Sequence, residues 1–214
     1  MTSIVCISDT HGRHASVSLP PGDILVHAGD CTNRGTAQEV AEFLQWLESQ
    51  PHEHKVLIAG NHDFLFEREP AAAIALLKTH APSVIYLNDS GATICGRKFW
   101  GSPVQPWFYD WAFNRQRGPE IQAHWDLIPA DTEVLVTHGP PHRLLDRVLS
   151  GENVGCVNLG KTLERLPSIK LSVFGHLHLQ GGRWIDERGR VSVNASICDE
   201  DYQPVHSPVV VELA

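Results

Sequence analysis

Side chains of the kinds that bind metals recur at five places in the sequence, each directly after a short apolar run. The five segments are Asp9-Thr10-His11, Gly29-Asp30, Gly60-Asn61-His62-Asp63, Thr137-His138-Gly139 and Gly175-His176-Leu177-His178. Their oxygen and nitrogen ligands are Asp9, His11, Asp30, Asn61, His138, His176 and His178. So many ligands suit two divalent ions that share a carboxylate, as in hydrolytic two-metal sites. Without a thiolate, the set fits Mn, Fe, Co, Ni or Zn.

The apolar runs explain why these segments should converge. Each run predicts a buried strand, and ligands bind at the carboxyl ends of the strands in open α/β sheets. In an extended segment Asp9 and His11 point to the same side, so both can approach one ion. The same holds for His176 and His178. Each motif alone also fits an ordinary polar turn, but five of them in one chain favour a shared site.

The same pattern continues along the chain as alternating strands and helices. The spacing predicts strands over 4–7, 24–27, 55–59, 84–87, 92–95, 98–100, 133–136, 171–174, 183–185, 191–193 and 209–211. Helices are expected over 36–49, 70–77, 119–127 and 157–166. The first of these is expected to begin with Thr36 as its N-cap, with Glu39 three residues later. Because the later part is rich in strands, we expect two packed sheets with helices outside.

Composition limits the class of protein. With 214 residues, the chain is expected to form a single domain over residues 1–214. A net charge of -8 argues against an extended nucleic-acid surface, since such domains usually carry a basic face. Five cysteines without a Cys-x-x-Cys pair indicate reduced thiols and a cytoplasmic protein. No apolar run reaches membrane-spanning length, so no membrane contact is expected. Among the 13 histidines, His27 lies within a strand and is expected to be a satisfied core residue.

In their order along the chain, the five segments resemble the calcineurin-like metallophosphoesterases. Four further segments, 22–30, 106–108, 137–141 and 194–196, are similar to the metallophosphodiesterase-domain proteins of the mammalian brain type. They extend the resemblance over nearly the whole chain. The resemblance implies an αββα sandwich of two mixed β-sheets flanked by helices, with a dinuclear metal site at the strand ends.

The resemblance also implies roles for individual residues. The first metal would be bound by Asp9, His11 and His178, and the second by Asn61, His138 and His176. Asp30 would bridge the two metals. His62 would contact the phosphate and assist the leaving group, with Asp63 orienting it. Some brain-type members lack the first histidine of the last motif. This chain has it as His176, so we expect an active enzyme.

Two further segments contain candidate substrate contacts. Residues 29–35 partly match the Gly-Asp-x-x-Asp-Arg-Gly motif of Ser/Thr protein phosphatases, but Asn33 stands in place of the second aspartate. Residues 101–118 form a long segment rich in aromatics and prolines, and loops of this length in a compact domain are usually functional. We take Asn33, Trp107 and Phe108 as candidate substrate contacts. An aromatic plug that seals a sheet edge is the alternative for the latter two.

We therefore expect a phosphoesterase with two divalent metal ions. The favoured activity is phosphodiester hydrolysis of small phosphodiesters or cyclic nucleotides by attack of a metal-bridging hydroxide. The expected partner is thus a small phosphoester, nucleotides included. A phosphomonoesterase or protein phosphatase is the alternative enzyme. A non-catalytic metal-bound scaffold is the alternative from another class, and His62 argues against it because a binding module needs no leaving-group acid.

Overall fold

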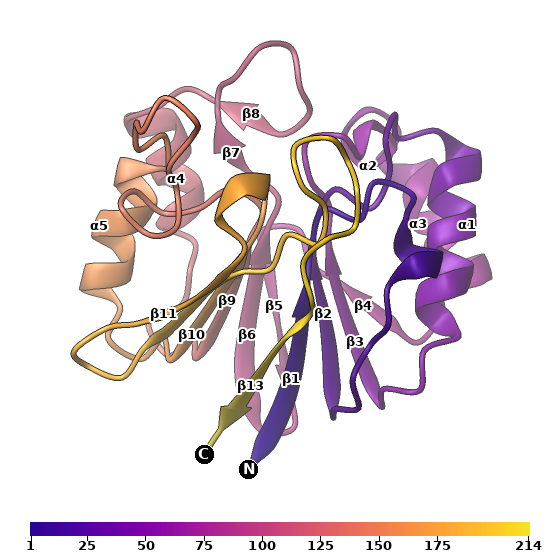
Figure 1. The fold of residues 1–214 in the computed structure, drawn as a ribbon, viewed down its shortest axis with the longest axis horizontal. Coiled ribbons are helices and arrows are strands. Elements are labelled where there is room, and N and C mark those ends of the chain that lie inside the picture. Colours follow the sequence, from indigo (N-terminus) through magenta and orange to yellow (C-terminus); the bar gives the residue numbers. More distant parts are fainter.

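Two β-sheets packed face to face form the centre of the molecule, and helices cover their outer faces (Figure 1). The computed structural model describes residues 1–214. The first sheet has the order β13 (Val209–Leu213), β1 (Thr2–Ile7), β2 (Ile24–Ala28), β3 (His54–Ile58) and β4 (Val84–Tyr86). The second has the order β11 (Gly182–Ile185), β12 (Val191–Asn194), β10 (Leu171–Phe174), β9 (Val134–Thr137), β6 (Arg97–Ser102) and β5 (Ser90–Ile94). The expected αββα sandwich is confirmed.

Three apolar layers hold the sandwich together. In β1, Ile4 and Cys6 face the second sheet, whereas Val5 and Ile7 face the helices, as the two-residue period of a strand requires. Helices α1 (Ala37–Glu48), α2 (Phe64–Arg68) and α3 (Pro70–His80) pack on the first sheet. Helices α4 (Pro119–Trp125) and α5 (Val157–Arg165) pack on the second. Each sheet is therefore buried on both faces, which explains the continuous apolar runs in the sequence.

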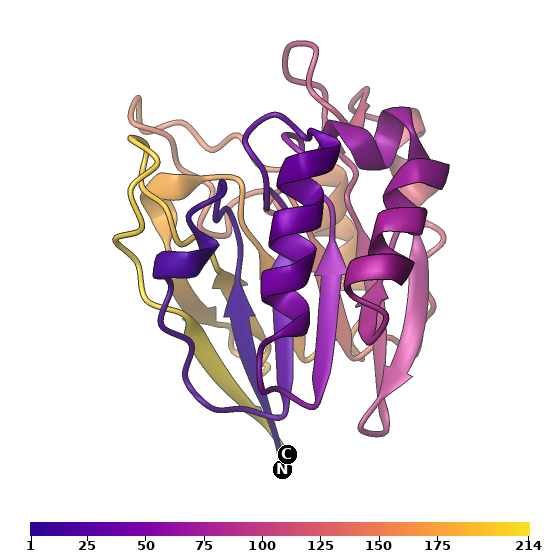
Figure 2. The ribbon, with the colours of Figure 1, turned by 90° about the vertical axis from the view of Figure 1, so that its right-hand side faces the viewer.

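The inner strands of both sheets run parallel. Strands β1, β2, β3 and β4 are parallel in the first sheet, and β6, β9, β10 and β12 are parallel in the second. Antiparallel strands are confined to the positions of β13, β5 and β11. The carboxyl ends of both parallel sets meet at the edge opposite the chain ends (Figures 1 and 2). All five candidate segments begin at this edge.

Local signals account for the first long helix but not for all elements. Thr36 and Glu39 form the predicted capping box at the start of α1. Helix α2 was not predicted, because five residues are too few to display a helical period. The aromatic segment contains a small ribbon of β7 (Gln105–Pro106) and β8 (Asn114–Arg115). Short 3-10 turns lie at η1 (His14–Ser16) and η2 (His178–Gln180). No helix combines the length and the apolar content required to cross a lipid bilayer.

Candidate functional site

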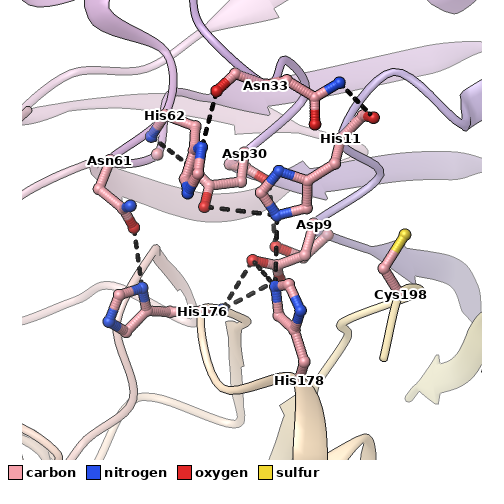
Figure 3. Close-up of polar contacts among 12 residues, drawn as sticks. Asp9, His11, Asp30, Asn33, Asn61, His62, His176, His178 and Cys198 are labelled. Carbon is pink, nitrogen blue, oxygen red and sulfur yellow. Dashed lines mark hydrogen bonds and ion pairs between the residues drawn. The ribbon is translucent and has the colours of Figure 1, made fainter. Parts of the chain in front are cut away.

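The structure brings all seven candidate ligands together where the strands end. Figure 3 labels all of them except His138. The first sheet supplies four of them, from the segments after β1, β2 and β3: Asp9, His11, Asp30 and Asn61. The second sheet supplies three, from the segments after β9 and β10: His138, His176 and His178. The site therefore spans the seam between the two sheets.

The ligand atoms fall into overlapping groups. Within each of three sets, one atom per residue lies within 4.8 Å of the others: Asp9, His11 and His178; Asp30, His138 and His176; and His11, Asp30 and His62. The Oδ1 atom of Asn61 lies 2.8 Å from Nε2 of His138 and 2.8 Å from Nδ1 of His176. Asp30 belongs to two of the three sets, and its Oδ2 atom lies 3.8 Å from Nε2 of His11 and 3.3 Å from Nε2 of His138.

The backbone turns sharply at the ligands. Asp9, His11, Asp30 and His176 have φ values of 52°, 42°, 55° and 69°, in the left-handed region that costs energy for residues with a side chain. Such strain clusters at functional sites and is held by the surrounding structure. A Cβ atom at Gly175 would overlap the Asp9 carboxylate, so only glycine lets the strand end approach that ligand.

The proton positions of two histidines indicate a cation site. Nδ1 of His138 lies 2.9 Å from the carbonyl oxygen of Ala28, and Nδ1 of His178 lies 2.8 Å from that of Asp199. A carbonyl oxygen only accepts, so both Nδ1 atoms carry a proton and Nε2 is the ring atom that faces the site. In the neutral form of each ring, this Nε2 atom presents a lone pair inward. The Nε2 atom of His138 then faces Asp30 Oδ2 at 3.3 Å. Lone pairs converging on buried oxygens call for a cation, and backbone-bonded histidines are typical of metal ligands. The residues present thus fit divalent metals.

Charge states support the same conclusion. Burial lowers the pKa of His11 and of His176 to about 4, so both rings are neutral near pH 7. Burial would raise the pKa of the Asp30 carboxyl, but the charge of His138 and its hydrogen bond hold it well below its usual range. Burial would likewise lower the pKa of His138, yet Asp30 raises it to about 9. Without metal, a proton on His138 therefore supplies the positive charge that the cluster requires.

His62 lies beside this cluster and is held by the backbone rather than by Asp63. Its Nδ1 donates to the carbonyl oxygen of Asn33 at 2.8 Å, and its backbone N–H donates to Asp30 Oδ1 at 2.7 Å. Its ring packs against the indole of Trp111 (ring centroids 4.2 Å apart). The predicted orientation of His62 by Asp63 is wrong.

The turn after Gly60 directs the Asp63 carboxylate to the other side, into the protein. There it accepts hydrogen bonds from the N–H of Gly60 at 2.8 Å, from the N–H of Thr32 at 3.0 Å and from Thr32 Oγ1 at 2.6 Å. Burial and the charge of Asp30 raise the pKa of this carboxyl. Asp63 thereby ties the segment after β2 to the segment after β3, which hold Asp30 and Asn61.

Two adjoining pockets open at the site. The metal-side pocket has a volume of about 270 Å³ and is lined by Asp30, Asn61, His62, Phe108, Trp111, Arg147, Val148, His176, Leu177, His178, Leu179, Glu200 and Tyr202. The side pocket has a volume of about 430 Å³ and is lined by Pro106, Trp107, Phe108, Arg117, Gly139, Pro140, Val148, Val154, Gly155, His176 and Leu177. Phe108 thus lines both pockets, and Trp107 lines the second.

Sequence reasoning missed some residues of the site. Trp111 is one of several aromatics in its segment, and nothing in the pattern distinguishes it. Arg147 and Tyr202 lie in irregular segments after β9 and β12, without any motif. Asn33 lines neither pocket; its side-chain Nδ2 donates to the His11 carbonyl oxygen at 2.9 Å (Figure 3). A substrate contact by Asn33 stays a prediction.

Comparisons with known proteins decide the family. Residues 2–180 match the family described as calcineurin-like phosphoesterase. Metallophosphoesterase domain-containing protein 1 of Homo sapiens is 41% identical over 99% of this chain and 71% of its own length. The chain belongs to the calcineurin-like phosphoesterases. It is accordingly a metal-dependent phosphoester hydrolase by family, and the resemblance drawn from the motifs is confirmed.

Further relatives and solved structures extend the comparison. A UPF0046 protein of Caenorhabditis elegans is 37% identical over 97% of this chain and 73% of its own length. The phosphopantetheinyl hydrolase of Mycobacterium tuberculosis superposes with a TM-score of 0.62 at 16% identity, covering 94% of this chain and 90% of that one. The protein TT1561 of Thermus thermophilus gives a TM-score of 0.62 at 12% identity, covering 90% and 88%. At these identities the two structures establish the shared fold alone.

Proposed function

We propose that this calcineurin-like phosphoesterase is a phosphodiesterase for small phosphodiesters or cyclic nucleotides that uses two divalent ions, with manganese as the first metal to test. The observation that carries the proposal is the seven-ligand cluster with Asp30 at its centre and His62 at its margin. Divalent ions in such a site supply Lewis acidity and lower the pKa of a water ligand. The protein's own side chains hold the ions and assist the leaving group.

The proposed ligands divide between two positions. Asp30 is the shared carboxylate, and the remaining ligands form two sets of three: Asp9, His11 and His178 for one ion, and Asn61, His138 and His176 for the other. Each set combines residues from both sheets. Substrate phosphate therefore binds over the seam, in the metal-side pocket.

His62 is proposed to assist the leaving group. Because its Nδ1 proton is donated to the Asn33 carbonyl oxygen, Nε2 is the ring atom left for the substrate. In the protonated ring, Nε2–H can donate to the ester oxygen as the P–O bond breaks, so that the alcohol leaves neutral rather than as an alkoxide. The hydrogen bond to Asn33 and the contact with Trp111 fix the ring for this transfer.

One observation favours phosphomonoesters as the second candidate. Arg147 lines the metal-side pocket and forms no ion pair with an acidic residue of the chain. A monoester carries one more negative charge than a diester, and a guanidinium can bind that extra oxygen. A monoesterase therefore remains the alternative activity.

The test is a screen of metal-reconstituted protein with matched substrates. Protein freed of metal and reloaded with Mn, Fe, Co, Ni or Zn is assayed with bis-aryl diesters, aryl monoesters and cyclic nucleotides. We expect turnover of diesters to exceed that of monoesters. Faster turnover of monoesters would favour the alternative, and metal binding without any turnover would favour a scaffold.

We also propose that the protein works in a reducing compartment such as the cytoplasm. All five cysteines are free thiols: Cys6, Cys31, Cys95, Cys156 and Cys198. Cys31 lies next to Asp30, and its Sγ lies 3.3 Å from Asp63 Oδ1. Oxidation there would enlarge a buried side chain beside the site, which a reducing environment avoids.

A further inference from the structure

We propose that the side pocket binds a planar ring carried by the ester group of the substrate. The inference rests on the proposed function, because it names the kind of ester that the phosphoesterase prefers. At about 430 Å³ the pocket falls within the range of small-molecule sites. It is large enough for a ring and leaves the metal-side pocket free for the phosphate.

The two pockets share part of their walls. Phe108, Val148, His176 and Leu177 line both of them. His176 also presents Nδ1 to Asn61 within the ligand cluster. One small molecule can therefore place its phosphate at the ligands and its ester group in the side pocket.

The walls favour a flat, uncharged group. Trp107 and Phe108 offer aromatic faces, and Pro106 and Pro140 add flat apolar ones. Trp107 is 51% exposed, so its face is available to a ligand. Rings stack on such surfaces in offset or edge-on arrangements. No acidic side chain lines the pocket, so nothing in it would pair with a cationic group.

Arg117 provides a further flat face and sets the charge preference. Its two terminal nitrogens donate to the carbonyl oxygens of Gly155 at 2.9 Å and of Val154 at 2.6 Å. These bonds fix the plane of the guanidinium, and a fixed guanidinium stacks on aromatic rings. Its positive charge disfavours cationic ligands. The pocket is thus built for neutral or electron-rich rings rather than for amines.

The test compares three phosphonates that differ only in the group on phosphorus. Phenylphosphonate, cyclohexylphosphonate and methylphosphonate are titrated into manganese-loaded protein by calorimetry. We expect phenylphosphonate to bind about 10-fold more tightly than methylphosphonate. Cyclohexylphosphonate, similar in bulk but not planar, should gain no more than about 3-fold.

Substitutions test whether the ring preference arises in the side pocket. Trp107→Ala should reduce the phenyl-to-methyl affinity ratio to below about 3-fold. The matched control is Trp184→Ala, which removes another half-exposed tryptophan, on the edge strand β11, and should keep the ratio of the parent. The substitution Val154→Trp fills the pocket with an indole from the protein itself. The preference for phenylphosphonate over methylphosphonate should then likewise be lost.

Three outcomes would overturn the inference: equal affinities for all three phosphonates, equal affinities for the phenyl and cyclohexyl compounds, or an unchanged ratio in Trp107→Ala. These outcomes are distinct from failure of the proposed function. If no phosphoester is turned over but the phenyl preference persists and depends on Trp107, the pocket stands and the phosphodiesterase proposal falls. If diesters are turned over but no ring preference is found, the phosphodiesterase proposal stands and the inference about the side pocket falls.

Discussion

The imidazole of His62 lies against the indole of Trp111, with ring centroids 4.2 Å apart and planes inclined by 32°. Phe64 stacks on Trp111 in turn, with centroids 5.8 Å apart, and the guanidinium of Arg68 lies 4.1 Å from the Phe64 ring centre. Further, the backbone N–H of Ala112 donates to the carbonyl oxygen of Asn61 at 3.2 Å. The aromatic segment therefore supports the side chain proposed to act on the leaving group.

Removing this support should impair turnover without loss of metal. Trp111→Leu leaves the imidazole free to tilt, and misplacement of a reacting group costs roughly 10- to 100-fold in rate. We expect kcat for an alkyl phosphodiester to fall by about that factor, whereas Trp111→Phe, which keeps an aromatic face, loses much less. Steady-state kinetics of both variants check this. A change in KM alone would mean that Trp111 only borders the substrate.

His62 itself should matter most for poor leaving groups. General acid catalysis contributes about 10²- to 10⁴-fold, and a nitrophenolate needs it far less than a ribose alkoxide does. His62→Ala should therefore lose modestly on nitrophenyl esters and heavily on alkyl or ribose esters. Rates across esters of graded leaving-group pKa should fall more steeply in the variant than in the parent. Parallel slopes would reduce His62 to a phosphate contact, and loss of a metal would make it a ligand.

Asp30 should control both metal positions. In the proposed site it is the one carboxylate shared by both sets of ligands, so Asp30→Ala should lower metal content at both positions and abolish turnover. Elemental analysis of dialysed protein measures the metal content. Asp126→Ala, which removes a surface ion pair with Arg165 and a hydrogen bond from Gln122, is the control. Two metals retained per chain in Asp30→Ala would refute the bridging role.

Asp63 should act on stability rather than on leaving-group chemistry. Asp63→Ala leaves the buried N–H groups of Gly60 and Thr32 without their acceptor, at a cost of about 1–3 kcal/mol for each. We expect a loss of at least about 2 kcal/mol in the free energy of unfolding. For Asp63→Asn, which keeps one oxygen, the loss should be smaller. Urea unfolding measures both losses. The leaving-group slope of Asp63→Asn should match that of the parent, and a slope like that of His62→Ala would restore the orienting role.

The ligand positions could be predicted from the sequence because each combines two signals: a short apolar run and a metal-binding side chain at its end. Asp63 could not be assigned correctly, since adjacency in sequence to His62 says nothing about which way a turn directs a carboxylate. Tyr202 could not be predicted from the sequence for another reason. Its ring lies edge-on to that of His11, with centroids 4.6 Å apart, but it reaches the site from an irregular segment without any pattern.

The predicted core histidine, His27, has a consequence for acid stability. It is fully buried; Gly29 N–H donates to its Nδ1 at 3.3 Å, and its Nε2 lies 3.0 Å from Thr10 Oγ1. Burial lowers its pKa to about 3, so between about pH 6.5 and 3 the unfolded chain takes up a proton that the folded chain refuses. Stability from this group is thus present above pH 6.5 and is lost as the pH falls.

By about pH 5 this loss should reach about 2 kcal/mol. Urea unfolding of metal-free protein at about pH 7.5 and about pH 5 should therefore give a drop that is smaller by that amount in His27→Gln than in the parent. His54→Gln, at a partly exposed position, serves as the control and should behave like the parent. An equal drop in His27→Gln would mean that the folded protein accommodates a charged imidazole.

Because the candidate ligands are divided between the two sheets, their geometry depends on how the sheets pack on each other. Val26 and Val136 lie between the sheets in strands that lead directly to Asp30 and His138. If one sheet slides over the other, the carboxylates move relative to the histidines by the same amount. Shortening either valine side chain, without changing a ligand, should thus lower metal affinity. Natural selection for metal binding would then also act on residues of the apolar core.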